Sequence, residues 1–273
     1  MQECDHVWLL PVAAAILGAG GMLIPYIIGA STGHIPALVP YISDGGANAP
    51  EGSFFSFLLT FAAITLALTF TLRHQQFVEF YHYRRLDKWW RYVSLVTLII
   101  GYITCIGMVV AGNFNEMTEL TVHNYSAIIL FVSAMLYIWL NVFLSFLRPR
   151  LCSLHIAIFR ILLAALALAA FIMHEITLNG NIFVPTGVPP HDEGDNSGYK
   201  IEFLTPDSPY YVNHTVATST EWLLALCIFV SILTLADEFR RSYITLPRMR
   251  FHSGADALGS AEGFYAKDTY RVE

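Results

Sequence analysis

Apolar residues along the chain are gathered into six long runs that contain few charged residues. A helix needs about 20 apolar residues to cross the hydrocarbon core of a bilayer, which is about 30 Å thick. The backbone polar groups of a spanning segment must be satisfied within that segment, so each run is predicted to be a transmembrane helix. The predicted spans cover residues 7–29, 54–72, 92–112, 125–147, 156–178 and 220–238.

The composition agrees with this pattern. Apolar residues make up 55% of the 273 residues and charged residues only 13%, which is about half the usual share in a soluble domain. A disordered chain, a collagen-like chain and a disulfide-stapled secreted module are therefore excluded. We predict an all-α fold, a polytopic membrane protein whose six-helix bundle occupies residues 1–245 and is followed by a flexible cytosolic tail at 246–273.

Lys and Arg residues alternate between the connections of the predicted bundle. Residues 73–91, 148–160 and the tail after 238 hold 14 of the 15, and the remaining one, Lys200, lies in the connection 179–219. Cytoplasmic connections carry an excess of Lys and Arg, so this bias predicts that both termini are cytosolic. The other three connections are predicted to face an organelle lumen or the cell exterior.

One cytosolic connection carries more positive charge than orientation requires. It contains two tryptophans together with Arg84, Arg85, Lys88 and Arg91. Basic residues beside a membrane attract anionic lipids by about 1 kcal/mol each. Two interpretations stay open: the basic residues only fix the topology, or they contact a phosphoinositide head group.

Short motifs add weaker indications. Tyr243 to Leu246 matches a tyrosine-based sorting signal, which a sorting adaptor would recognise on the C-terminal tail, although so short a pattern also arises by chance. Asn213 begins an Asn-His-Thr glycosylation sequence in the connection 179–219, on the side where glycosylation occurs. None of the four cysteines lies in a non-cytosolic connection, so no disulfide is expected there.

Polar residues near the non-cytosolic ends of the spans are candidates for chemistry. They are His123, His174, Glu175 and Glu221, with Asp44 and Glu51 on the same side. Such a cluster could titrate or transfer protons; alternatively, its members cap helix ends among lipid head groups. The chain has no nucleophile elbow, phosphate loop or zinc-protease helix, so we predict no enzyme activity, cofactor or metal. Membrane lipids and unidentified proteins, rather than nucleic acid, are the expected partners.

The connection after the first span has a distinctive sequence at residues 40–54, PYISDGGANAPEGSF. Its candidate residues are Pro40, Tyr41, Ile42, Ser43, Asp44, Pro50 and Glu51. The prolines restrain the backbone, Gly45 and Gly46 permit positive φ, and Asp44 can accept hydrogen bonds from the amides that follow it. The loop is predicted either to cap the helix ends or to contact a lipid head group or a partner.

This sequence resembles the signature of the DRAM family, the damage-regulated autophagy modulators, within a superfamily that includes Frag, Sfk and TMEM150-type proteins and the N-terminal part of Cwh43. The segments 123–127, 221–222 and 233–240 are similar too. The resemblance implies six spans, residence in lysosomes or late endosomes, and a non-enzymatic part in autophagy. Other branches imply regulation of phosphoinositide synthesis at the plasma membrane, or remodelling of the lipid of GPI anchors. The family usually has Cys where this chain has Ser53, so no Cys-dependent role is carried over.

Overall fold

The computed structural model describes residues 3–85, 89–147, 150–189 and 200–245, so the predicted tail at 246–273 lies outside the described residues. Six of its helices are long and apolar enough to cross a membrane, which confirms the predicted all-α bundle with six spans. They are α1 (Leu9–Thr32), α2 (Glu51–Tyr83), α3 (Trp89–Asn113), α4 (Glu116–Phe146), α5 (Leu154–Gly180) and α6 (Tyr211–Leu233). The shorter elements are β1 (Glu3–Cys4), the 3-10 helix η1 (Ser43–Gly46), α7 (Leu235–Phe239) and β2 (Ile244–Thr245).

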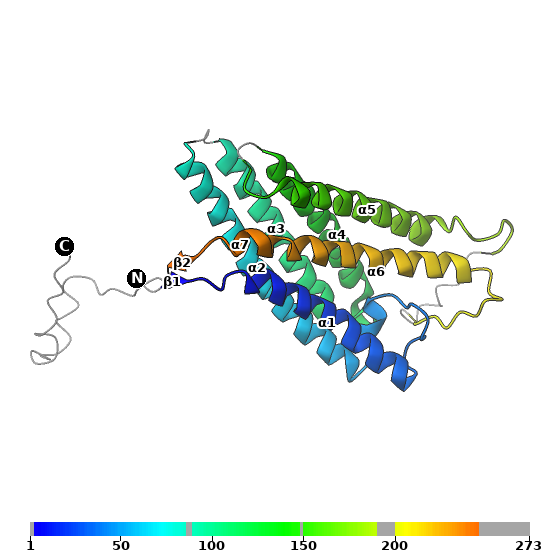
Figure 1. Ribbon diagram of the computed structural model, residues 1–273. Coiled ribbons are helices and arrows are strands. Elements are labelled where there is room, and N and C mark those ends of the chain that lie inside the picture. Colours follow the sequence, from blue (N-terminus) through cyan, green and yellow to red (C-terminus); the bar gives the residue numbers. More distant parts are fainter. Residues whose placement is uncertain (1–2, 86–88, 148–149, 190–199, 246–273) are drawn as a thin grey trace, which may run out of the picture.

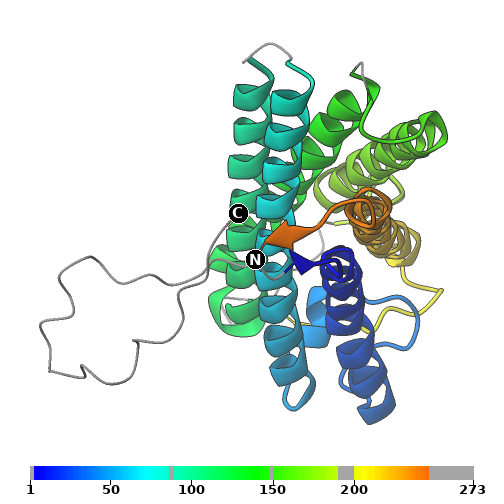
Figure 2. The same ribbon diagram turned by 60° about the vertical axis from the view of Figure 1, so that its left-hand side comes forward.

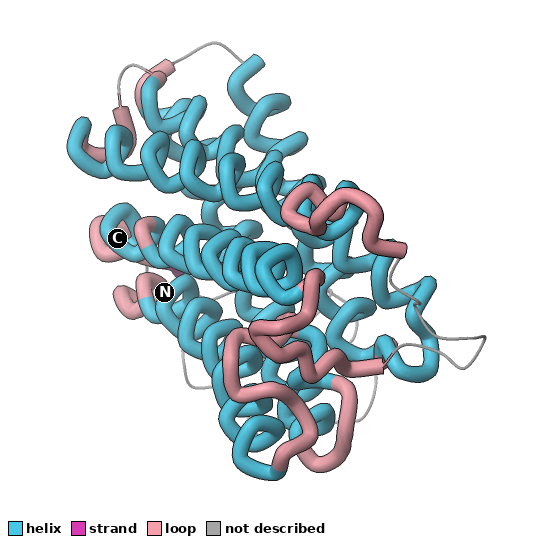
Figure 3. The backbone as a smooth tube through the Cα atoms, turned by 90° about the vertical axis from the view of Figure 1, so that its right-hand side faces the viewer, coloured by secondary structure: helices cyan, strands magenta, loops and turns pink. Residues whose placement is uncertain are grey.

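The six long helices form a closed ring. Each contacts the next helix along the chain, and α1 also contacts α6, which closes the ring. Figure 1 shows β1 and β2 together at one end of the bundle, called the strand end here. The opposite end contains η1 and is called the loop end. Figure 3, viewed from that side, shows how the loops gather over it.

Three helices extend well beyond their predicted spans, and one of them is α4, which begins at Glu116 instead of residue 125. α2 begins at Glu51 and ends at Tyr83, so Arg73 lies inside the helix and not in a connection. α6 begins at Tyr211, which places Glu221 roughly three turns inside the helix rather than in its first turn. Hydropathy misses the extensions of α2 and α6 because their polar residues face protein: Arg73 is 2% exposed and Asn213 6%.

Glycines allow several helices to approach closely. A Cβ on Gly107 of α3 would lie 2.9 Å from the backbone nitrogen of Leu130 on α4. A Cβ on Gly101 of the same helix would meet the ring of Phe70 on α2 at 2.6 Å. Small residues of this kind bring membrane helices together where lipid provides no hydrophobic driving force. The outer faces carry large exposed apolar side chains, as a lipid-facing surface requires.

A two-stranded sheet joins the beginning and the end of the described chain. β1 and β2 are antiparallel, with Glu3 opposite Thr245 and Cys4 opposite Ile244. Figure 2 shows this pair beside the ends of α1 and α6. The residues before the first span are thereby tied to those that follow the last one.

Candidate functional site

The loop between α1 and α2 is held against α6 by two hydrogen bonds. The indole Nε1 of Trp222 donates to the carbonyl oxygen of Pro40 at 2.9 Å. The amide of Ile42 donates to Glu221 Oε2, also at 2.9 Å. Glu221 therefore accepts from a buried backbone group of a distant loop, instead of capping its own helix. These contacts bring together the 40–54 sequence and the Glu-Trp pair, which lie far apart in the chain.

Asp44 and the glycines of this loop have contacts that the sequence did not predict. Asp44 Oδ2 accepts a hydrogen bond at 2.9 Å from the amide of Tyr41, which precedes it in the chain, whereas the sequence-based prediction concerned only the amides that follow. Among the described glycines, positive φ occurs at Gly33 and Gly187, and not at Gly45 or Gly46. Close packing explains Gly46 instead, because a Cβ there would lie 2.8 Å from the ring of Phe55.

Three carboxylates from separate elements lie near one another at the loop end: Asp44 of η1, Glu116 at the start of α4, and Glu221 of α6. We call them the carboxylate cluster. All three are buried, and the charges of Asp44 and Glu221 both act on Glu116. One oxygen of Glu116, Oε1, has no hydrogen-bond partner among the described residues. The sequence analysis counted Glu116 only as one of several acidic residues on this side, because nothing local shows that it turns inward.

The neighbours of the carboxylate cluster include Tyr41 and His123. Burial, and next the negative charge of Glu221, raise the pKa of Tyr41 above its usual range, so its hydroxyl stays protonated. His123 is buried, with its Nδ1 3.0 Å from the carbonyl oxygen of Phe114 and its Nε2 3.9 Å from Glu116 Oε2. The cluster thus combines acceptors with groups able to donate.

The remaining predicted members of the polar group, Glu51, His174 and Glu175, have partners other than the carboxylate cluster. Glu51 is fully buried at the start of α2, and its Oε1 lies 2.6 Å from Nδ1 of the half-exposed His34. His174 lies 3.0 Å from the carbonyl oxygen of Ala217 and contacts the ring of Tyr41 edge-on. Glu175 lines neither cavity described below and accepts a hydrogen bond from Asn179 in its own helix. Among the described residues, no group of three His, Cys, Asp or Glu side chains is arranged to hold a metal ion.

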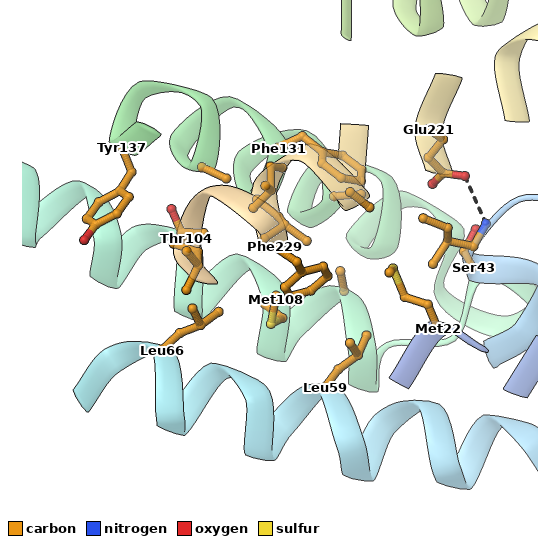
Figure 4. A pocket seen from close by; sticks show the side chains of 18 of the residues that line it. Met22, Ser43, Leu59, Leu66, Thr104, Met108, Phe131, Tyr137, Glu221 and Phe229 are labelled. Atoms are coloured by element: carbon orange, nitrogen blue, oxygen red, sulfur yellow. Dashed lines mark hydrogen bonds between the residues drawn. The ribbon is translucent and has the colours of Figure 1, made fainter. Parts of the chain in front are cut away.

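Two cavities adjoin the carboxylate cluster. One is apolar, measures about 80 Å³ and runs through the bundle between Glu221 at the loop end and Tyr137 on α4 (Figure 4). The other is a polar cleft of about 460 Å³ between the η1 loop and the facing ends of α2, α3 and α4. Ser43, Phe55, Ala111 and His123 line both, so the two spaces share a wall.

The predicted glycosylation residue is buried. Asn213 lies in the first turn of α6 and is 6% exposed. Its Nδ2 donates to the carbonyl oxygen of Thr177 at 2.8 Å and to Asn181 Oδ1 at 3.1 Å, and its Oδ1 accepts from the amide of Phe183 at 3.3 Å. A glycan on Nδ2 would replace one of the two hydrogens that make its bonds to Thr177 and Asn181, and the glycosylation of Asn213 stays a prediction that is tested below.

A buried ion network at the strand end escaped the sequence analysis. The guanidinium of Arg160 on α5 makes two hydrogen bonds to Glu238, at 2.8 and 2.6 Å, and Arg73 on α2 makes a third at 3.0 Å. All three side chains are at least 97% buried. The network joins α2, α5 and α7. Arg73 and Arg160 lie far from Glu238 in the sequence, so no local pattern predicts that they share this acceptor.

The predicted basic and sorting residues lie at the strand end. Arg84, Arg85 and Arg91 are exposed, and the guanidinium of Arg84 lies 5.7 Å from the ring centre of Phe80. Lys88 lies outside the described residues. Tyr243 is 60% exposed, directly before β2, and Leu246 again lies outside the described residues.

Comparison with known proteins gives a consistent result. The model of the Frag1/DRAM/Sfk1/Cwh43P N-terminal domain matches residues 6–242. The chain is 27% identical to DNA damage-regulated autophagy modulator protein 2 of Bos taurus, covering 85% of this chain and 84% of that protein. It is 29% identical to DNA damage-regulated autophagy modulator protein 1 of Xenopus laevis, covering 86% of this chain and 94% of that protein. It is also similar to Modulator of macroautophagy TMEM150B of Danio rerio, with 27% identity over 52% of this chain and 59% of that protein. No solved structure matches the chain.

Proposed function

Because this chain belongs to the Frag1/DRAM/Sfk1/Cwh43P N-terminal domain family, we propose that it is a non-enzymatic regulator of autophagy in a lysosomal or late-endosomal membrane. The observation that carries the proposal is the similarity to autophagy modulators over almost the whole bundle. The same six spans make the chain an integral membrane protein.

The non-enzymatic part of the proposal draws support from the way the carboxylates are used. Glu221 and Asp44 accept hydrogen bonds from backbone amides of the η1 loop, and Glu238 accepts from two arginines. Carboxylates whose oxygens already accept hydrogen bonds from the chain serve to hold its elements together, which favours a structural role for them over a catalytic one. The alternative of a lipid-remodelling enzyme is tested by the variants Glu221→Gln and His123→Gln: altered lipid composition with an intact fold would favour the enzyme.

Autophagic flux is the direct test of the proposal. Cells that lack the chain would be compared with the same cells after re-expression of the wild-type chain, with flux measured as turnover of a lipidated autophagosome marker with and without lysosomal inhibition. We expect loss of the chain to lower flux and re-expression to restore it. Flux that is equal in all three cell lines would contradict the proposal.

The compartment is tested separately through Tyr243. A tyrosine that an adaptor reads must be accessible, and this side chain is exposed. We expect tagged Tyr243→Ala to move from lysosomes to the cell surface, as seen by imaging against organelle markers. Tyr83→Ala is a matched control, because Tyr83 is also exposed at the strand end but lies outside the motif.

A second candidate function rests on the exposed arginines at the end of α2 and the start of α3. Together with the half-exposed ring of Trp89, Arg84 and Arg91 form a basic and aromatic surface suited to anionic head groups. This surface supports a scaffold for phosphoinositide synthesis at the plasma membrane. Residence of the wild-type chain at the cell surface, with phosphoinositide levels that fall in Arg84→Gln/Arg85→Gln, would favour this candidate over the first.

A further inference from the structure

The two cavities at the loop end differ in chemistry and meet at a common wall. The apolar cavity is lined mainly by aliphatic, aromatic and methionine side chains from five of the six long helices, as Figure 4 shows for Leu59, Met108 and Phe229. The polar cleft is lined mainly by small or polar residues such as Ser53, Ser56 and Asn113. Two adjoining spaces, one polar and one apolar, match the two parts of an amphiphile, with its head in the cleft and its chain directed into the bundle.

The polar groups that line the cleft restrict the head group. Its acidic lining residue is Glu116, and neither Lys nor Arg is among the described residues that line it. Glu116 is 4% exposed and its carboxyl group contacts Ser43 and Asp44, but its Oε1 has no hydrogen-bond partner in the described parts of the chain, so this buried oxygen can accept from a bound donor. Hydroxyl and ammonium groups supply such a donor, whereas a phosphate brings further acceptors to a cleft that offers no compensating Lys or Arg among its described lining residues.

The size of the apolar cavity restricts the chain. An engineered cavity of about 150 Å³ holds one benzene molecule, so a cavity of about 80 Å³ admits only a slender aliphatic segment. Met22 and Met108 line it, and the flexible side chain of methionine can adjust to an entering chain. A short stretch of a single alkyl chain meets these limits, and a bulky ring system does not.

We propose that the loop end binds a single-chain amphiphile whose head group carries hydroxyl or amino donors and no phosphate. The head contacts Glu116 in the polar cleft, and the chain passes the shared wall at Phe55 and Ala111 into the apolar cavity. This binding site goes beyond the proposed role in autophagy and does not depend on it.

Photo-crosslinking of the full chain in nanodiscs tests the site. The probe is a long-chain amino alcohol with a photoreactive group in its alkyl chain, and the competitors are the unlabelled amino alcohol, a monoacylglycerol and a lysophosphatidate of equal chain length. We expect saturable labelling, with the lysophosphatidate competing at least about tenfold more weakly than the better of the other two. Competition by the amino alcohol alone identifies an ammonium head, and competition by both identifies hydroxyl donors. Equal competition by the lysophosphatidate, or labelling that does not saturate, overturns the proposal.

Peptide mapping locates the bound chain without any substitution. We expect the crosslinks of the wild-type chain at cavity residues such as Met108 or Phe131. Crosslinks confined to lipid-facing residues such as Leu162, which is 63% exposed, would overturn the proposal.

Two matched pairs of variants complete the test. Ala127→Leu adds bulk inside the apolar cavity, whereas Ala165→Leu adds the same bulk on the exposed face of α5. Glu116→Gln replaces the carboxyl group that lines the polar cleft, whereas Glu119→Gln replaces one at an exposed position near the start of α4. In variants that keep the wild-type elution volume and melting temperature, we expect labelling to fall at least about tenfold for Ala127→Leu and Glu116→Gln only. Unchanged labelling in both cavity variants would overturn the proposal.

Discussion

Gly52 lies against the backbone of the η1 loop. A Cβ at this position would lie 2.5 Å from the carbonyl oxygen of Gly46, and a backbone atom cannot rotate aside as a side-chain atom can. We expect Gly52→Ala to destabilise the bundle by about 1–3 kcal/mol, measured by thermal unfolding in detergent. Gly20→Ala is the control, because the nearest atom that its Cβ would meet is a flexible Ile24 methyl at 3.8 Å. Equal melting temperatures for the two variants would show that the loop does not pack on α2 as described.

Asn213 provides a second prediction at the scale of single residues. Since its amide is buried and hydrogen-bonded to three partners, we expect the chain from eukaryotic cells to carry no glycan at this position. The measurement is the gel mobility of the wild-type chain and Asn213→Gln, each with and without an N-glycosidase. A glycosidase shift that is present in the wild type and absent in the variant would contradict the burial of this residue.

The sequence placed the candidate residues at the correct end of the bundle but did not reveal their partners. The location of His123 and Glu221 at the loop end was predicted because both lie near the ends of apolar runs. The bond from the Ile42 amide to Glu221 joins groups that are far apart in the chain, and local pattern contains no information about it. The inward orientation of Glu116 depends in the same way on the packing of η1 against α4.

At the scale of helices, the ion network at the strand end predicts that replacing the shared acid destabilises the bundle more than replacing one of its arginines. Glu238 is the acceptor for both arginines, so Glu238→Gln leaves two buried cations without a counter-charge. Removing one partner of a buried ion pair costs about 3–5 kcal/mol, and we expect a loss of this size for Glu238→Gln. Arg73→Gln should cost clearly less, because the two-bond pair of Arg160 and Glu238 remains neutral. Unfolding in mixed micelles measures both.

The exposed pair of Arg241 and Asp237 is the control for this comparison. Their side chains are 59% and 40% exposed, and an exposed ion pair contributes at most about 1 kcal/mol. Arg241→Gln should therefore unfold almost as the wild type does. A loss for Arg73→Gln that equals the loss for Glu238→Gln would show that the three side chains do not share one acceptor.

Hydropathy identified all six helices because each contains a long apolar run, but it misplaced their ends. α2 continues past Leu72 through Arg73, His74 and Gln76, a stretch that reads as a connection in the sequence. These side chains have hydrogen-bond partners on other helices. Gln76, for example, donates to the carbonyl oxygen of Glu238 at 3.0 Å. A polar residue ends a predicted span, but it does not end a helix when a neighbouring element provides the partner.

For the whole molecule, the distribution of Lys and Arg predicts which end faces the cytosol. Tyr83 and Asp207 are exposed at opposite ends of the bundle, and the native cysteines at 105, 152 and 227 are buried. In a Cys4→Ser background, we expect a membrane-impermeant maleimide to label Tyr83→Cys only after the cytosolic face is opened. Asp207→Cys should be labelled only from the opposite face. The reverse pattern would invert the assignment of both ends.

The position of Glu238 near the end of the bundle sets an order on biosynthesis. A ribosome makes Arg73 and Arg160 first and adds their common acceptor only after the sixth span has been synthesised. Until then Gln76 and Ser145 offer hydrogen bonds to the two guanidinium groups, but neither offers a counter-charge. We therefore expect the helices that carry the arginines to settle into their final arrangement only after residue 238 has been added.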